Sequence, residues 1–323
     1  MKTLYKILGA IAGLVALLII FVLLVGNKKF DAPYPDITAS SDATVIERGR
    51  HLVFGPSHCA SCHAAPRALA EMDDGAMKPL IGGMEMDIPP VTLRAANLTP
   101  DMETGIGSFT DGEIARAVRY GIGRDGHFMI PVMEYSRMSD EDLTAIISYL
   151  RAQPAVSNKV EKTEFKFLGK ALLAFGVLKP KQFTETPPKS VSKDDIIAYG
   201  EYIATGVANC VGCHTNTDLM SGEFIVPPFA GGFYFEPEAM TEGYGFVSPN
   251  LTPDRETGII ANWTEEVFIN RMKAGRVHKT SPMPWGAFTN LDSMELSALF
   301  RFLQSLEPVN NAVGQTVFQP GEL

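Results

Sequence analysis

Cysteine is scarce in this sequence. The chain has 323 residues and only four cysteines, and all four lie in two short stretches, SHCASCHAAP at 57–66 and NCVGCHTNTD at 209–218. No cysteine is left for any other role. The function of these residues must therefore be read from the repeated pattern that contains them: Cys59, Cys62, Cys210 and Cys213.

Basic charge is in deficit as well. Lys and Arg number 28 against 37 Asp and Glu, which gives a formal net charge of -9. A nucleic-acid partner would require a basic face, so this balance argues against one. Alternating strand patterns are few, and we expect mostly helix and loop. With 46% hydrophobic residues, the chain has a globular composition and is long enough for about two domains.

One long run carries no charge. ILGAIAGLVALLIIFVLLV, residues 7–25, lies between lysines on both sides and is long enough to cross the ~30 Å hydrocarbon core of a membrane as a helix. A cleaved signal peptide is the alternative, but its apolar stretch is usually ~7–15 residues long and ends in a small-residue cleavage site. We therefore expect a transmembrane anchor over 1–26 and an extended tether over 27–45.

The remainder reads as one unit written twice. NLTPDMETGI at 97–106 returns as NLTPDRETGI at 250–259, and each copy is followed by a helical pattern that begins at Thr110 or Thr264 and has capping residues. Gly49 and Gly200 recur on the helix before each cysteine pair, where a glycine would allow close approach of the unit's closing helix. This tandem duplication predicts domains at 46–155 and 191–310, with a C-terminal tail over 311–323.

Residues 156–190 connect the two predicted domains. Their centre is the apolar segment FKFLGKALLAFGVLKPK at 165–181, which contains scattered lysines. We expect a helix that packs against the globular domains. A position on the membrane surface is the alternative.

The cysteine pattern itself has three readings: a zinc half-site, a redox dithiol or a haem attachment point. Zinc sites made from two CxxC pairs usually keep the pairs ~15–20 residues apart, whereas Cys62 and Cys210 lie in separate copies. A redox dithiol would leave His63 and His214 unexplained. Cys-x-x-Cys-His is the signature of c-type haem attachment, in which two thioethers hold the haem and the adjacent histidine is the proximal iron ligand.

With these motifs the chain resembles membrane-anchored dihaem cytochromes c that have two tandem class I cytochrome c domains. It is especially similar to cytochrome c subunits that accept electrons from periplasmic dehydrogenases, in which NLTPDxxTGI also precedes a methionine ligand loop. The resemblance implies an all-α fold, two covalently bound haem c groups, and haem domains in the periplasm behind an inner-membrane anchor.

The resemblance also implies residues that support the haem. In the family, a proline carbonyl accepts the Nδ1–H of the proximal histidine, and Pro79 and Pro228 occupy the matching position here. Asn97 and Asn250 are expected to order the loop over the haem edge. Trp263 is expected to donate its indole N–H to a haem propionate, a donor that the first copy lacks.

The second axial ligand is expected to be methionine, since histidine and methionine together raise the haem potential. In the second copy SPMPW places Met283 in a proline-stiffened loop. In the first copy Met129, Met133 and Met138 compete, and only Met133 matches the repeat. His127 and His278 are the alternatives.

We therefore expect a relay that passes single electrons from a periplasmic donor, such as a dehydrogenase, to an oxidase, another cytochrome or quinone-linked machinery, without substrate chemistry of its own. A dihaem peroxidase is the alternative from the enzyme class, and a haem-based sensor is a third reading. Glu134, beside Met133, predicts a lower potential for the first haem and electron entry there. A solvated Glu134 whose field is screened is the alternative.

Overall fold

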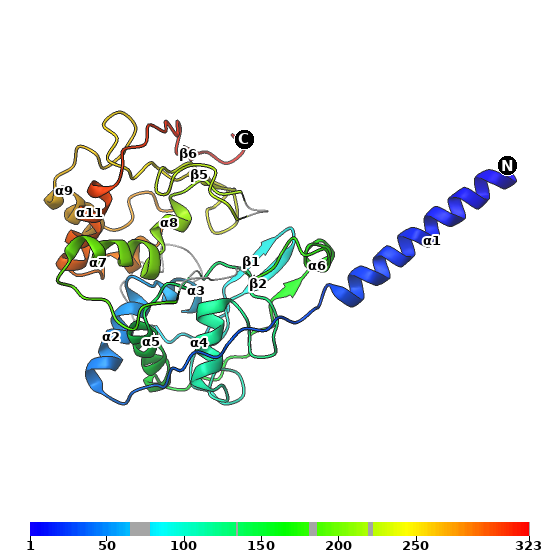
Figure 1. The fold of residues 1–323 in the computed structure, drawn as a ribbon, viewed down its shortest axis with the longest axis horizontal. Helices are drawn as coiled ribbons and strands as arrows, with labels where there is room; N and C mark the ends of the chain where they lie inside the picture. The colour runs from blue at the N-terminus through cyan, green and yellow to red at the C-terminus, as the bar shows by residue number, and fades with distance from the viewer. Residues whose placement is uncertain (65–77, 134, 181–185, 219–221, 323) are drawn as a thin grey trace.

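The computed structural model describes residues 1–64, 78–133, 135–180, 186–218 and 222–322 (Figure 1). The helices in this part of the chain are α1 (Lys2–Val25), α2 (Ala43–Phe54), α3 (Cys59–His63), α4 (Asp111–Tyr120), α5 (Asp140–Ala152), α6 (Phe167–Ala174), α7 (Ile196–Tyr202), the π-helical turn η2 (Ile203–Val207), α8 (Cys210–Cys213), α9 (Glu265–Lys273), α10 (Trp285–Phe288) and α11 (Ser293–Ser305). The strands are β1 (Glu85–Ile88), β2 (Val91–Arg94), β3 (Glu164–Phe165), β4 (Tyr234–Phe235), β5 (Gly245–Val247) and β6 (Val317–Phe318). The fold is mostly helical, as the sequence predicts.

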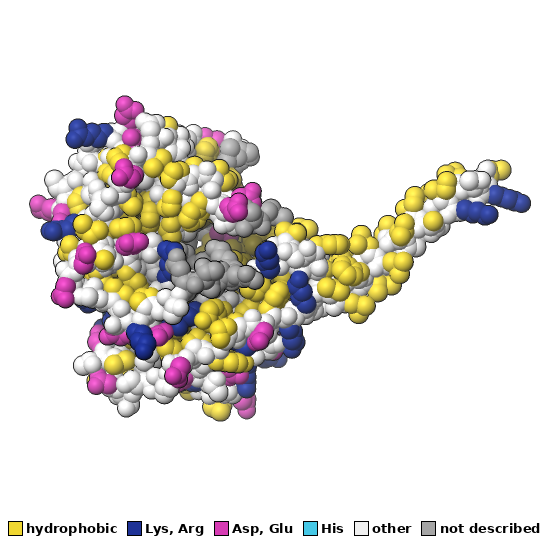
Figure 2. All heavy atoms as spheres, in the orientation of Figure 1, with side chains coloured by type: hydrophobic (Ala, Val, Ile, Leu, Met, Phe, Trp, Pro, Cys, Tyr) yellow, Lys and Arg dark blue, Asp and Glu magenta, His cyan; other side chains and the backbone are white. Residues whose placement is uncertain are grey.

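Helix α1 projects away from the rest of the molecule (Figure 1), and Figure 2 shows its surface as almost entirely apolar. Its most apolar window has a mean hydropathy of 3.1, and only 6% of that window is buried. By length and composition this helix is either a membrane anchor or a signal sequence.

Two units of matching architecture follow, the first at 43–165 and the second at 196–318. In each, the helix before the cysteine motif packs against the closing helix: α2 on α5, and α7 on α11. A Cβ atom on Gly49 would lie 1.9 Å from the Ala145 carbonyl oxygen, and one on Gly200 would lie 2.0 Å from that of Ala298. Only glycine permits helices this close, which confirms the reason we gave for the repeated glycine.

A small antiparallel sheet completes each unit. Strands β1, β2 and β3 form the first sheet, and β4, β5 and β6 form the second. Strand β3 lies within the predicted linker (156–190), and β6 lies within the predicted C-terminal tail (311–323). These strands have two to four residues each, too few to show a periodic pattern.

The segment that follows α1 is extended and fixed along the first unit. The Phe30 N–H donates to the Gly126 carbonyl at 2.8 Å, and the Ala39 N–H donates to Asp111 Oδ2 at 2.8 Å. Ile37 is buried in the core. The segment predicted as a tether is therefore bound to the first unit at several points, and little of it is free between α1 and that unit.

A charged cluster joins the two units. Arg48 on α2 contacts Asp142 Oδ1 at 2.9 Å and Glu295 Oε1 at 3.0 Å. His51 contacts Glu295, and Tyr202 donates to Asp142 at 2.8 Å. His51 and Tyr202 occupy equivalent positions in the duplication, as do Asp142 and Glu295. The His51–Glu295 and Tyr202–Asp142 contacts therefore join equivalent positions of opposite units. These reciprocal contacts relate the two units by approximate two-fold symmetry.

Candidate functional site

The cysteine motifs form two short helices, α3 in the first unit and α8 in the second (Figure 1). Each begins after a residue in the left-handed conformation, His58 with φ 38° and Asn209 with φ 49°. None of the four cysteines is paired in a disulfide. Two thiols one helical turn apart, followed by a histidine, make a donor set that suits covalent haem attachment. Among the described residues, no three His, Cys, Asp or Glu side chains gather as a metal site.

The two histidines are oriented by the same backbone position in both units. His63 Nδ1 lies 2.7 Å from the Ala96 carbonyl oxygen, and His214 Nδ1 lies 3.1 Å from that of Pro249. Ala96 and Pro249 both directly precede the NLTPD motif. Donation from Nδ1–H to a carbonyl leaves Nε2 with a lone pair that is available to a metal ion.

This geometry corrects our assignment of Pro79 and Pro228 as the acceptors. The loops that contain these prolines lie against the histidine main chain: Gly82 and Gly231 donate their N–H groups to the carbonyls of His63 and His214, at 2.7 and 2.8 Å. The Pro79 carbonyl instead accepts from the Ile81 N–H at 2.9 Å. Sequence reasoning did not identify the residue before NLTPD as the hydrogen-bond acceptor, although this position recurs in both copies.

The protonation state of both histidines suits iron binding. Burial lowers the pKa of His63 and of His214, although each accepting carbonyl partly offsets this effect. Desolvation disfavours the imidazolium form. Each ring is therefore neutral at physiological pH, as an iron ligand must be.

Asn97 and Asn250 fix the NLTPD loops from inside the protein. Their side chains are 2% and 0% exposed. Asn97 Nδ2 donates to the Val156 carbonyl at 2.9 Å, and Asn250 Nδ2 donates to that of Val309 at 2.8 Å. These bonds tie each loop, and with it the carbonyl facing the histidine, to the chain that follows the closing helix.

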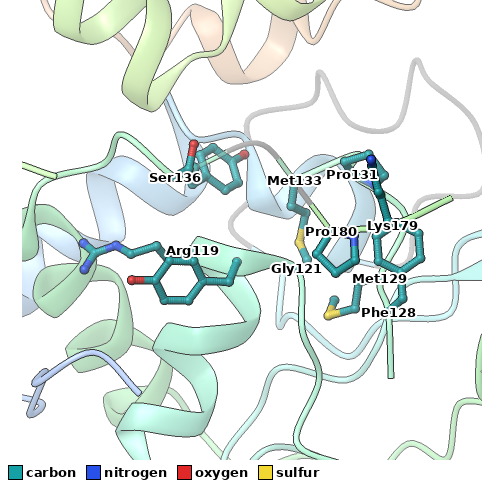
Figure 3. A pocket seen from close by; sticks show the side chains of 11 residues that line it. Arg119, Gly121, Phe128, Met129, Pro131, Met133, Ser136, Lys179 and Pro180 are labelled. Atoms are coloured by element: carbon teal, nitrogen blue, oxygen red, sulfur yellow. The ribbon is translucent and has the colours of Figure 1, made fainter. Parts of the chain in front are cut away.

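The methionine segments differ between the units. Met133 is partly buried and lines a pocket together with Met129 (Figure 3), whereas Met138 is fully buried in the core. Burial at Met138 fits core packing, so the described geometry leaves Met133 and Met129 as the ligand candidates of the first unit. Glu134 lies outside the described residues.

In the second unit, the methionine is held by its neighbours. The Trp285 N–H donates to the Met283 carbonyl at 2.8 Å, and its indole Nε1 donates to Ser281 Oγ at 3.2 Å. The guanidinium carbon of Arg271 lies 3.7 Å from the centre of the Trp285 ring. Trp263 lies elsewhere, partly buried against the core.

Aromatic side chains from both units meet beside the first cysteine motif. The His58 ring lies 6.5 Å from Tyr135 and 5.7 Å from Phe288, which belongs to the second unit. The buried Tyr135 hydroxyl donates to the Ser57 carbonyl and lies within electrostatic range of cysteines in both motifs, Cys59 and Cys213 among them. The two motifs therefore approach each other at this cluster.

Comparison with known proteins agrees with this architecture. No protein-family model matches the chain. It is 28% identical over 302 residues to the cytochrome c subunit of alcohol dehydrogenase (quinone) from Gluconacetobacter polyoxogenes, across 88% of this chain and 60% of that subunit. It is 27% identical over 315 residues to the gluconate 2-dehydrogenase cytochrome c subunit of Pantoea cypripedii, across 93% of this chain and 67% of that subunit.

A third relative is a "Diheme cytochrome c-type" protein of Cereibacter sphaeroides, 27% identical over 247 residues, across 72% of this chain and 79% of the relative. These three relatives are cytochromes c or cytochrome c subunits. The mostly helical fold and the two CxxC motifs are consistent with two cytochrome c domains. The chain spans 60% of the length of the alcohol dehydrogenase subunit.

Proposed function

We propose that this protein is a dihaem c-type cytochrome that relays single electrons between a periplasmic dehydrogenase and an acceptor of the respiratory chain. The observation that carries this proposal is the matched pair of CxxCH helices, each with its histidine Nδ1 facing the carbonyl before NLTPD. A haem bound at each motif would supply one-electron redox chemistry.

The protein residues would position and insulate these groups. Cys59 and Cys62 would hold one haem, and Cys210 and Cys213 the other. His63 and His214 would be the proximal ligands, with Met133 and Met283 on the opposite sides. The carbonyls of Ala96 and Pro249 would fix the tautomer and raise the basicity of each imidazole. Trp263 would donate to a propionate of the second haem.

Transfer between the two sites would take place inside the protein. The buried Tyr135 contacts His58 and lies within electrostatic range of cysteines in both motifs, so an electron would not have to cross solvent. The charged cluster around Arg48 holds the two units in this arrangement. A short, rigid connection of this kind suits a relay.

The location and the partner follow from the relatives and from α1. Thioether formation takes place outside the cytoplasm, so residues 30–323 would be periplasmic and α1 would remain as an inner-membrane anchor. The matched cytochrome c subunits belong to dehydrogenases, which supports a dehydrogenase as the electron donor.

Purification of the full chain from membranes in mild detergent tests this proposal. We expect two covalently bound haems per chain, reversible one-electron reduction at both, and co-purification with a dehydrogenase. A single haem per chain would contradict it. Binding of carbon monoxide to one ferrous iron, or of peroxide to one ferric iron, without prior loss of an iron ligand would favour the dihaem peroxidase instead.

A further inference from the structure

Helix α6 and the turn that follows it expose large apolar side chains on one surface. Phe167 and Leu168 are 53% and 50% exposed, and Phe175 and Val177 are 60% and 37% exposed. Single apolar residues are common on protein surfaces, but a contiguous group of them marks an interaction site. We call this group the α6 apolar surface.

The opposite side of α6 is fixed to the first unit. A Cβ atom on Gly169 would lie 2.1 Å from the Pro90 carbonyl oxygen, so the helix rests directly on the turn between β1 and β2. The Lys166 N–H donates to the same carbonyl at 3.0 Å, and Lys166 Nζ lies 2.7 Å from Asp87. The α6 apolar surface is therefore held rigidly on the outside of the first unit.

The same helix also packs against the end of α1. Val22 is only 1% exposed, although most of α1 is exposed. The rings of Phe21 and Phe175 lie 5.6 Å apart. A Cβ atom on Gly26 would lie 2.6 Å from Lys170 Cβ, so the two chains approach closely here. Figure 2 shows apolar atoms continuing from α1 onto the body of the protein.

This contact sets the depth of α6 when α1 spans a membrane. Phe21 lies four residues before Val25, the last residue of α1. If Val25 marks the hydrocarbon boundary, Phe21 lies about 6 Å inside it at the helical rise of ~1.5 Å per residue. Phe175, beside it, must then lie at a similar level. Interfacial helices bury their apolar faces about 5–10 Å into this same zone.

Lysines occur where lipid headgroups would lie. Lys28 and Lys29 follow the end of α1, and Lys170 and Lys179 lie on or just after α6. Lysine side chains at this level extend to the headgroups and attract anionic lipids. The α6 apolar surface thus continues the membrane-spanning surface of α1 and is bordered by basic residues.

We propose that the α6 apolar surface is embedded in the outer leaflet of the membrane, beside the end of α1, and holds the first unit against the bilayer. This inference rests on the anchor in the proposed function. Two attachments, α1 and α6, would fix the tilt of the haem domains as well as their distance from the membrane, which a single helix and a flexible tether would not do. The contacts with the first unit already exist, so the sequence expectation that this helix packs on the globular domains holds at the same time.

Collision accessibility of a spin label on the full chain in lipid nanodiscs tests this. The four native cysteines are expected to be consumed by haem, so a single introduced cysteine can be labelled in each variant. Phe175→Cys and Leu168→Cys report on the α6 apolar surface. Leu14→Cys in α1 is the lipid control, and Val277→Cys, at a position 77% exposed in the second unit, is the aqueous control.

We expect the labels at 175 and 168 to collide more often with oxygen than with a water-soluble nickel complex, as at 14 and opposite to 277. A nickel preference at 175 and 168, with oxygen preference retained at 14, would overturn the inference and leave the anchor intact. Low collision with both reagents would also overturn it, because the surface would then be covered by protein. An aqueous label at 14 would contradict the anchor itself.

Discussion

The two units agree closely on the histidine side of each site and differ on the methionine side. Both place a neutral histidine against the carbonyl that precedes NLTPD, and both tie that loop down with a buried asparagine. The methionine loops share no such plan. Met283 precedes helix α10 and a tryptophan that is hydrogen-bonded and stacked on Arg271, whereas Met133 lies beside Met129 in a pocket.

The difference indicates where the two copies of a duplicated unit can vary. The cysteines and histidine must meet fixed requirements of bond geometry, so the loops around them are held in the same way twice. In the proposed function the methionine would be a single, unbranched ligand on a loop, and several backbone arrangements can present its sulfur. We therefore expect the two haems to share their proximal environment and to differ in potential through the distal loop.

The largest effect should come from removal of the axial methionines. Met283→Ala should abolish about half of the weak near-infrared charge-transfer band of sulfur-ligated ferric haem and lower the potential of one haem, because His/Met ligation raises it. Met133→Ala should abolish the other half. Absorption spectroscopy and redox titration of the purified protein measure both effects.

Matched substitutions at the neighbouring methionines serve as controls. Met138→Ala should keep the full band and lower the free energy of unfolding by about 2–5 kcal/mol, as expected for a buried side chain. Met129→Ala should keep the band as well. Should the band fall in Met129→Ala and persist in Met133→Ala, the ligand of the first unit would be Met129.

Loss of the guanidinium between the units should have the next largest effect. Arg48→Met leaves two carboxylates, Asp142 and Glu295, without their shared partner, and these are 6% and 1% exposed. Removal of one partner from a buried ion pair costs about 3–5 kcal/mol, which chemical denaturation would measure. Arg50→Met, two residues along the same helix and paired with the exposed Glu47, should cost under about 1 kcal/mol. Equal losses in the two variants would contradict a special role for Arg48.

Acid should break the same cluster. Burial alone would raise the pKa of Glu295, but hydrogen bonding to His51 and the nearby positive charges lower it from 4.5 to about 2. Because the pKa of Glu295 is lower in the folded state than in the unfolded state, this carboxylate stabilises the folded protein fully at pH values above the unfolded-state pKa of 4.5. The stabilisation is lost as the pH falls from 4.5 to about 2. The shift corresponds to about 3 kcal/mol. Glu295→Gln should flatten this acid limb in unfolding curves measured between pH 6 and pH 2, and an unchanged limb would argue against the assignment.

These features were predictable from sequence to different degrees. The CxxCH motifs, the Thr110 capping box and the close-packed glycines could be predicted because each depends on residues near one another in the chain or on the internal repeat. The acceptor for the histidines was missed, since any residue can supply a carbonyl and the side chain gives no sign of it. The Arg48 cluster was missed because it exists only once two units meet.

The smallest expected effect concerns the residue before the capping threonine of each unit. Trp263 and Phe109 occupy the same turn, since each donates its N–H to an isoleucine carbonyl, at 3.1 and 3.0 Å. An indole N–H directed at a propionate of the second haem would partly neutralise that charge. Phenylalanine at 263 would leave the propionate more negative, and a negative charge stabilises the ferric state. A hydrogen bond from a neutral donor stabilises a charged acceptor by about 1.5–3 kcal/mol. We expect roughly 1 kcal/mol of this to act on the haem potential, which is about 40 mV for one electron.

Redox titration of Trp263→Phe should thus show one midpoint potential lowered by about 40 mV and the other unchanged. Phe109→Trp should raise the other midpoint if the first unit can place a donor in the same way. A Trp263→Phe protein with both midpoints at their original values would show that Trp263 packs against the core without touching a propionate.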